Sequence, residues 1–213
     1  MTNKEKVLIT GSSRGLGKAL ANLFINEGHS VVLHGRDEER LNNLISSLSC
    51  KDQIEYFVSD LAIPKNIDSI SEYAKLKNVQ LLINNAGLHC ANKNFHDLDE
   101  DYINNAIDLN LKAPILLIHK MMGFLNGVIN INSMSGLENK KLRTIYASSK
   151  WGLKGFSECL KKEDLDLKIL DVYPSSIKTN VNITYGMDPG NVAKSIYTSY
   201  YQNKTELIID GRK

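Results

Sequence analysis

The 213-residue sequence has few of the features of secreted, metal-binding or membrane proteins. Its three cysteines, Cys50, Cys90 and Cys159, are odd in number, widely spaced and outside any CxxC or Cys/His pattern, so we expect buried or unreactive thiols and no metal site. No apolar run approaches the roughly 20 residues of a membrane span. The first residues also lack the basic start and apolar block of a secretory signal. These absences predict a cytoplasmic protein that does not bind membranes.

Excess charge of one sign is also missing. The 26 Lys and Arg residues nearly balance the 24 Asp and Glu residues, and the basic residues are scattered rather than grouped in a stripe, so nucleic-acid binding is not expected. The length suits one domain, 1–213, with a full hydrophobic core. Composition alone allows either an enzyme or a binding domain.

Short apolar runs alternate with segments of helical apolar spacing along the whole chain. Alternation of this kind requires crossover connections, and hence a parallel sheet covered on both faces. We therefore predict an α/β fold, a Rossmann-type doubly wound sheet. The candidate strands are Val7–Thr10, Val31–Leu33, Glu55–Val58, Gln80–Ile83, Val128–Ile131, Lys168–Val172 and Leu207–Ile209.

Three irregular stretches, 84–98, 132–145 and 175–191, each follow a candidate strand. In open α/β sheets, ligands bind at the carboxyl ends of the strands. We therefore expect these stretches to surround a ligand site.

A glycine-rich loop directly follows the first candidate strand. Gly11, Gly15 and Gly17 allow a sharp turn, close approach of the backbone to a pyrophosphate and close helix packing, while the next helix offers its free N–H groups to the anion. A glycine-rich turn can be purely structural, but its place between a strand and a helix favours dinucleotide binding.

The end of the second strand indicates which dinucleotide. Sites for NAD place an acidic residue there to bind the ribose 2′-OH, whereas an arginine accommodates the 2′-phosphate of NADP. Gly35 occupies the acidic position and Arg36 follows it, while Arg14 belongs to the glycine-rich loop. Asp37 is better explained as a helix cap than as a ribose ligand. The two arginines predict a preference for NADP over NAD.

Four further signatures follow in order: Asn-Asn-Ala-Gly at 84–87, Asn110, Ser133, and Tyr146 with Lys150 in a YxxxK pattern. Together with TGxxxGxG at 10–17, they resemble the short-chain dehydrogenase/reductase family over essentially the whole chain. The serine precedes the tyrosine by the spacing that this family shows.

Tyr146 and Lys150 suit acid–base chemistry independently of that resemblance. Four residues apart on a helix, they share a face, and an ammonium near a phenol should lower the pKa of the tyrosine toward working pH. Tyr146 can then donate a proton to a carbonyl oxygen that Ser133 also holds. A nicotinamide would supply the hydride.

The resemblance implies further roles. Lys150 would bind the nicotinamide ribose, and Asn110 would hold a water in a proton relay. Pro114 has no N–H for the Asn110 carbonyl; we expect either that the freed carbonyl accepts this water or that the helix simply bends there. Ser175 replaces the glycine of the family's Pro-Gly motif and would be strained if positive φ is needed. The expected cofactor-binding residues are Gly11, Ser13, Arg14, Gly15, Leu16, Gly17, Arg36, Asp60, Leu61, Asn85, Ala86, Gly87, Tyr146, Lys150, Pro174, Ile177 and Thr179.

The substrate part is less defined. Family members resembling this chain carry a longer lid, so we infer a lid shortened near 180–190 and an open pocket. The basic loop 138–143 can steer an acidic carrier protein or a phosphorylated substrate, although a solvated turn is the preferred interpretation. Within the pocket, Ser133, His89, Arg143 and Tyr146 are the substrate-binding candidates. Further lining candidates are Leu88, Leu137, Ile145 and Tyr185.

These observations favour an NADPH-dependent oxidoreductase that reduces a ketone or aldehyde to an alcohol, or catalyses the reverse. A 3-oxoacyl-thioester reductase acting on acyl carrier protein is the alternative enzyme. A non-catalytic, cofactor-sensing regulatory protein is the alternative from another class, but such a sensor has no need of the acid Tyr146. The resemblance also implies a homodimer or homotetramer, paired through the helix after Tyr146.

Overall fold

The computed structural model describes residues 4–163, 165–178 and 185–212, and it confirms the predicted doubly wound sheet. Seven parallel strands follow the order β3-β2-β1-β4-β5-β6-β7. The chain therefore starts in the middle of the sheet, winds to one edge, and then winds to the other. The strands are β1 (Lys6–Ile9), β2 (Ser30–Gly35), β3 (Ile54–Val58), β4 (Leu81–Asn84), β5 (Gly127–Ile131), β6 (Lys168–Pro174) and β7 (Glu206–Ile209).

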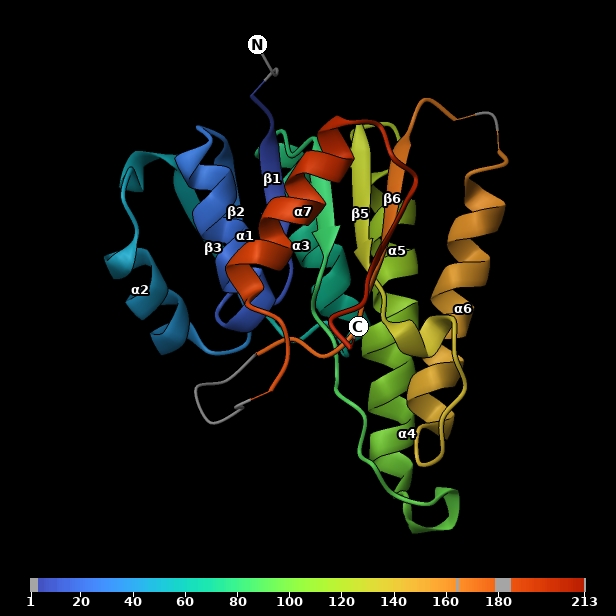
Figure 1. Cartoon of the computed structure of the whole chain (residues 1–213). Helices are drawn as coiled ribbons and strands as arrows, with labels where there is room; N and C mark the ends of the chain where they lie inside the picture. Colours follow the sequence, from blue (N-terminus) through green and yellow to red (C-terminus); the bar gives the residue numbers. More distant parts are fainter. Residues whose placement is uncertain (1–3, 164, 179–184, 213) are drawn as a thin grey trace.

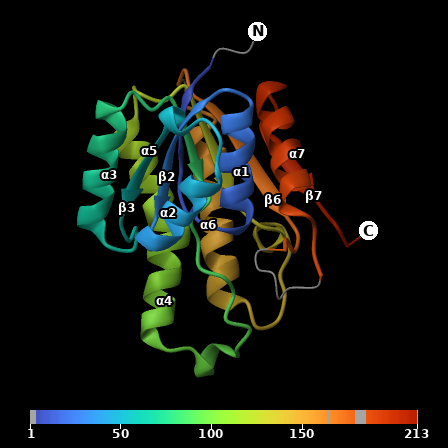
Figure 2. The same ribbon diagram turned by 90° about the vertical axis from the view of Figure 1, so that its left-hand side faces the viewer.

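Helices cover both faces of the sheet (Figures 1 and 2). One face packs against α1 (Gly15–Asn26), α2 (Glu38–Ser47) and α7 (Pro189–Tyr201). The other face packs against α3 (Pro64–Leu76), α5 (Ala113–Met121) and α6 (Thr144–Leu160). The remaining helix, α4 (Glu100–Ile107), lies against α6 and extends beyond the carboxyl edge of the sheet in Figure 1.

Alternation along each strand feeds two cores. In β1, Val7 and Ile9 join the core under α1, whereas Leu8 joins the core under α3 and α5. Successive side chains of a strand point to opposite faces, so a strand buried on both faces is apolar at most positions. The buried polar exceptions are His34 in β2, Asn84 in β4, Asn130 in β5 and Asp171 in β6. None of the helices within the described ranges has the length and apolar character needed to cross a membrane.

Short helical turns complete the connections at 51–53, 95–97 and 134–136. Between α4 and α5 the chain forms a wide π turn, Asp108–Lys112, which is the kind of interruption that Pro114 predicts because a proline cannot donate to the carbonyl four residues earlier. Asn110 lies in this turn and is buried.

Candidate active site

A cavity of about 830 Å³ opens along the carboxyl edge of the sheet. The segments that follow β1, β2, β3, β4, β5 and β6 all contribute to its wall, as expected for an open α/β sheet. The wall includes these predicted residues: Gly11, Ser13, Arg14, Gly15, Leu16, Gly17, Arg36, Asp60, Leu61, Asn85, Ala86, Gly87, Ser133, Tyr146, Lys150, Pro174, Ile177, Leu88, His89, Arg143 and Tyr185.

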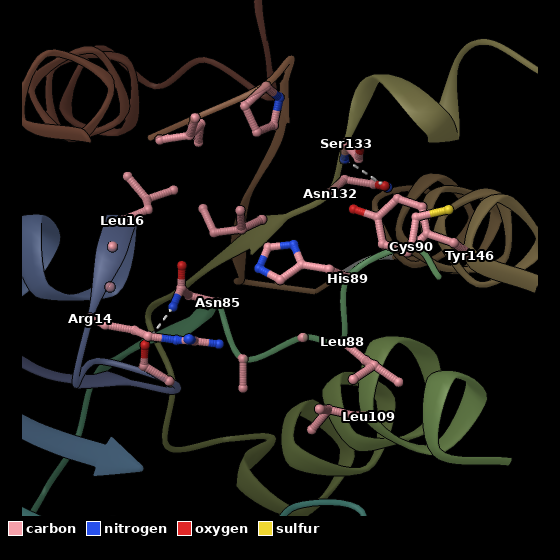
Figure 3. Close-up of a pocket in the computed structure, with 18 of the residues that line it drawn as sticks. Arg14, Leu16, Asn85, Leu88, His89, Cys90, Leu109, Asn132, Ser133 and Tyr146 are labelled. Atoms are coloured by element: carbon pink, nitrogen blue, oxygen red, sulfur yellow. Dashed lines mark hydrogen bonds between the residues drawn. The ribbon is translucent and has the colours of Figure 1, made fainter. Parts of the chain in front are cut away.

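We call the part of the cavity around Gly11 and Arg36 the loop end, and the part around Ser133 and Tyr146 the tyrosine end. Figure 3 shows both, with the ring of His89 between Arg14 on one side and Tyr146 on the other. Segments far apart in the sequence therefore form one continuous cleft.

The backbone of the glycine-rich loop is close-packed. Gly11 has φ +65°, and a Cβ there would lie 2.9 Å from the Cα of Ala86. A Cβ on Gly17 would meet the carbonyl oxygen of Gly11 and lie 2.6 Å from Nδ2 of Asn85. Glycine is therefore required at both positions.

The side chain of Asn85 holds this loop against the strand β4 side of the sheet. The amide of Asn85 donates to the carbonyls of Thr10 at 2.8 Å and Gly11 at 3.0 Å. Helix α1 begins at Gly15 without a side-chain cap, so its first N–H groups remain available to an anion. The cradle fits the pyrophosphate of a dinucleotide.

His34, a residue that sequence reasoning missed, holds the glycine-rich loop through its imidazole ring. Its Nδ1 accepts from the Gly11 N–H at 3.3 Å, and its Nε2 lies 3.1 Å from the Ser59 carbonyl, which places the proton on Nε2. The ring is 2% exposed, and burial lowers its pKa to about 4. A histidine inside an apolar strand run was the available signal.

Arg36 and Asp37, at the end of β2, have different partners. Asp37 caps α2 by accepting from the Arg40 N–H at 3.0 Å, as predicted, and pairs with the Arg40 guanidinium at 2.9 Å. Arg36 is mostly exposed, and its NH1 lies 3.3 Å from Oδ2 of Asp60. The loop end thus carries two arginines, Arg14 and Arg36, along the cavity wall.

At the tyrosine end, α6 places Tyr146 and Lys150 on one face, with Nζ of Lys150 5.9 Å from the centroid of the tyrosine ring. The ammonium donates to the Ile131 carbonyl at 3.0 Å. Ser133 follows β5, and a hydrogen bond from its side chain acts to lower the pKa of Tyr146. Figure 3 shows Ser133 beside Asn132, whose Oδ1 accepts from the Ser133 N–H at 2.9 Å.

The expectation that Lys150 lowers the pKa of Tyr146 is wrong for this structure. Burial is the largest influence on the phenol and raises its pKa. Burial also lowers the pKa of Lys150 to about 8. A phenol with a raised pKa is fully protonated at neutral pH and is therefore ready to donate its proton.

Asn110 lies behind the cavity wall rather than in it. Its Oδ1 accepts from the Leu88 N–H at 2.7 Å, and its Nδ2 donates to the Leu88 carbonyl at 3.1 Å and lies 3.3 Å from the Ser149 hydroxyl. The side chain thereby joins the π turn to the loop after β4 and to α6.

Several substrate-side predictions need correction. Leu137 and Ile145 do not line the cavity; Ile145 directly precedes Tyr146 on α6, and adjacent helical residues point to different sides. Ser175 is not among the described residues with positive φ, so the feared strain is absent. Its Oγ instead accepts from the Gly211 N–H at 2.9 Å. The predicted Thr179 lies outside the described residues.

The three cysteines are free thiols. Cys50 and Cys159 are exposed, so for these two the buried alternative is wrong, and their lack of reactivity stays a prediction. Cys90 lines the cavity next to Tyr146 (Figure 3) and its thiol donates to the Leu142 carbonyl at 3.2 Å.

Comparisons with known proteins agree with this geometry. The model of the short chain dehydrogenase family matches residues 5–189. An uncharacterized oxidoreductase of Staphylococcus aureus is 28% identical over 211 residues, which cover 92% of this chain and 90% of the relative.

Two solved structures are similar at 25% identity. One is a bulky-bulky ketone specific alcohol dehydrogenase of Comamonas testosteroni, with a TM-score of 0.88 over 97% of this chain and 86% of the other. The second is a metagenomic short-chain oxidoreductase in complex with NADP, with a TM-score of 0.83 over 97% and 96% of the two chains.

Proposed function

The chain belongs to the short chain dehydrogenase family and is an NAD(P)-dependent oxidoreductase, and we propose that it uses NADPH to reduce a ketone or an aldehyde to an alcohol. The observation that carries this proposal is the cavity that runs from Arg14 and Arg36 to Tyr146 and Ser133. It joins a phosphate cradle to a proton donor. We further infer that the chain forms one domain; the predicted lid near 180–190 lies partly outside the described residues.

Tyr146 acts as the general acid. A nicotinamide bound in this cavity would supply a hydride to the carbonyl carbon. The Tyr146 hydroxyl gives its proton to the carbonyl oxygen, so that C=O becomes CH–OH. Burial raises the pKa of Tyr146, which keeps the phenol protonated before the reaction. The Ser133 hydroxyl donates to the same oxygen and stabilises the charge that develops on it.

Lys150 and Asn110 help to return a proton to Tyr146 after each turnover. The Lys150 ammonium stabilises the tyrosinate that proton donation leaves behind, and it would hold the ribose of a bound nicotinamide nucleotide. Pro114 offers no N–H to the Asn110 carbonyl, which leaves that carbonyl to accept a water that passes a proton from solvent toward Lys150.

The proposed preference for NADPH over NADH depends on the charged residues at the loop end of the cavity. No carboxylate is available there for the ribose 2′-OH in the described wall, because Asp37 caps α2 and Asp60 faces Arg36. Arg14 and Arg36 instead offer two guanidinium groups to a 2′-phosphate, a strong charge-assisted contact. The similar metagenomic oxidoreductase that holds NADP supports this preference, and the Comamonas ketone-specific enzyme supports a ketone substrate.

The proposal is tested with a panel of ketones and aldehydes, followed at the nicotinamide absorbance with NADPH and with NADH. We expect Tyr146→Phe to lower kcat by about 10²- to 10⁴-fold, as for a lost general acid, with NADPH affinity retained. Arg36→Leu should lower kcat/KM for NADPH by about 10- to 100-fold, as for a hydrogen bond to a charged group, and leave NADH almost unaffected. Unchanged turnover in Tyr146→Phe, or a clear preference of the wild type for NADH, would refute it.

Assembly is a separate inference. We propose a homodimer or homotetramer that pairs through α6, because Trp151 on this helix is 41% exposed and an exposed indole is typical of contact surfaces.

A further inference from the structure

Charge is distributed unevenly along the cavity. The two acidic residues of its described wall, Asp37 and Asp60, follow β2 and β3 at the loop end. The part of the wall built after β5 and β7 carries Lys140, Arg143 and Arg212 and no acidic residue among those described. The substrate therefore meets a positively charged wall.

Most of these cations already have partners. Arg212 donates to both carboxylate oxygens of Glu138, at 2.8 and 2.9 Å. Lys140 lies 3.5 Å from the same carboxylate. At the tyrosine end, Lys150 donates to the Ile131 carbonyl. Arg212 and Lys140 are neutralised by Glu138, and Lys150 is held by a backbone carbonyl. Arg143 is the remaining cation on this part of the wall.

Arg143 has no carboxylate partner within the described residues. It is half-buried, lies three residues before Tyr146, and its charge acts on the tyrosine hydroxyl. A guanidinium has five N–H donors; one of them donates to the Ser135 Oγ at 3.1 Å. Ser135 is 2% exposed, so it holds the guanidinium from the protein side, and Arg143 itself lines the cavity.

His89 does not replace this charge. Burial, followed by the positive charges of Arg14 and Lys150, lowers its pKa, so the ring is neutral at physiological pH. Arg143 is the cation that persists beside the reacting position, and its planar fork matches a carboxylate in two parallel hydrogen bonds.

We propose that Arg143 binds a carboxylate of the substrate, so that the enzyme reduces small oxo acids to hydroxy acids. This inference rests on the proposed carbonyl reduction by Tyr146. A carboxylate, with one negative charge, suits a single unpaired guanidinium, whereas a phosphate dianion would need a second free cation that Glu138 has already taken.

The test compares short-chain oxo acids with their methyl esters, which keep the carbonyl and lose the charge, using the full chain and NADPH. We expect kcat/KM for the acids to exceed that for the esters by about 100-fold, the effect of a desolvated charge pair. In Arg143→Met this preference should fall by about the same factor, mainly through KM. Arg143→Lys, which keeps the charge and loses the fork, should restore part of it.

Lys141→Met is the matched control. Lys141 is exposed, belongs to the same loop and does not line the cavity, so removing its charge should leave the preference for acids unchanged. NADPH affinity, measured by fluorescence titration, shows whether each variant is folded.

The outcomes separate the two proposals. If no carbonyl compound, acid or ester, is reduced, the proposed function fails. If neutral ketones and esters are reduced as well as acids, carbonyl reduction stands and the role of Arg143 is overturned. Equal losses on acids and esters in Arg143→Met would also overturn it, because they would assign Arg143 a purely structural role through Ser135.

Discussion

His34 should make the stability of the protein depend on pH in a defined window. The ring lies under the glycine-rich loop, 2% exposed, with Nδ1 accepting from Gly11 and Nε2 next to the Ser59 carbonyl. Protonation would place a second N–H against the Gly11 N–H and a charge in an apolar site. The folded state therefore disfavours the charged ring, and burial lowers the pKa of His34 to about 4.

The magnitude follows from linkage. In the unfolded chain the histidine has its ordinary pKa of 6.5, against about 4 in the folded state. Between these values the unfolded state binds more protons, so the free energy of unfolding increases with pH. The contribution is fully present above pH 6.5, and its loss amounts to about 2 kcal/mol at pH 5 and about 3 kcal/mol near pH 4.

Urea unfolding of the wild type and of His34→Asn, followed between neutral pH and pH 5, measures this effect. Asparagine offers an acceptor near Nδ1 and does not titrate, so the wild type should lose about 2 kcal/mol more than the variant on acidification. All carboxylates are common to both proteins and cancel in the comparison. Parallel stability curves would refute the reasoning.

A matched control separates stability from cofactor binding. His29 is a second buried histidine with a lowered pKa, packed against Tyr197 and Tyr201 of α7. His29→Asn should change the pH dependence of stability and leave NADPH affinity unchanged. His34→Leu, which leaves the Gly11 N–H unpaired, should raise KM for NADPH by about tenfold with a smaller effect on kcat.

Glycine-to-alanine changes at two positions should have opposite effects. Gly17→Ala, whose Cβ would meet fixed backbone, should lower the free energy of unfolding by about 1–3 kcal/mol and should weaken NADPH binding. A Cβ on Gly155 of α6 would have nothing within 4 Å, so Gly155→Ala should raise the free energy of unfolding by about 0.5–1 kcal/mol. Urea unfolding measures both variants. NADPH affinity should fall as pH rises through about 8, where buried Lys150 loses its proton. An NADPH affinity, measured by fluorescence titration, that does not change with pH would contradict this. Glu138→Gln, which removes the carboxylate that Arg212 and Lys140 bind, leaves more positive charge on the substrate side and should lower KM for an oxo acid at unchanged NADPH affinity; an unchanged KM rules out a role of this pair in substrate binding.

Sequence patterns predicted the fold well for a physical reason. A parallel strand buried on both faces needs a continuous apolar run, and such runs are visible without a structure. All seven candidate strands are present in the sheet, with ends displaced by at most two residues. The ligand site followed from the same patterns, because the irregular segments after β4, β5 and β6 must meet at one edge.

Properties set by tertiary packing were not predictable. Spacing places Lys150 on the same helix face as Tyr146, but it does not show that the ammonium binds Ile131 or that burial governs the phenol. The histidine at position 34 is visible in the sequence, but its hydrogen bonds to Gly11 and Ser59 are not, because those partners follow two other strands. Arg212 lies 74 residues from Glu138, a distance at which sequence offers no signal of pairing.

Ser175 connects the end of β6 to the C-terminal tail. Where the family pattern has glycine, this chain has a hydroxyl that accepts from the Gly211 N–H, and the next residue, Arg212, reaches Glu138 in the segment between β5 and α6. The tail thus lies along the substrate side of the cavity, where Arg212 forms part of the wall. Arg212 and Arg143 therefore both line the substrate side of the cavity, Arg212 with its charge paired to Glu138 and Arg143 without a carboxylate partner within the described residues.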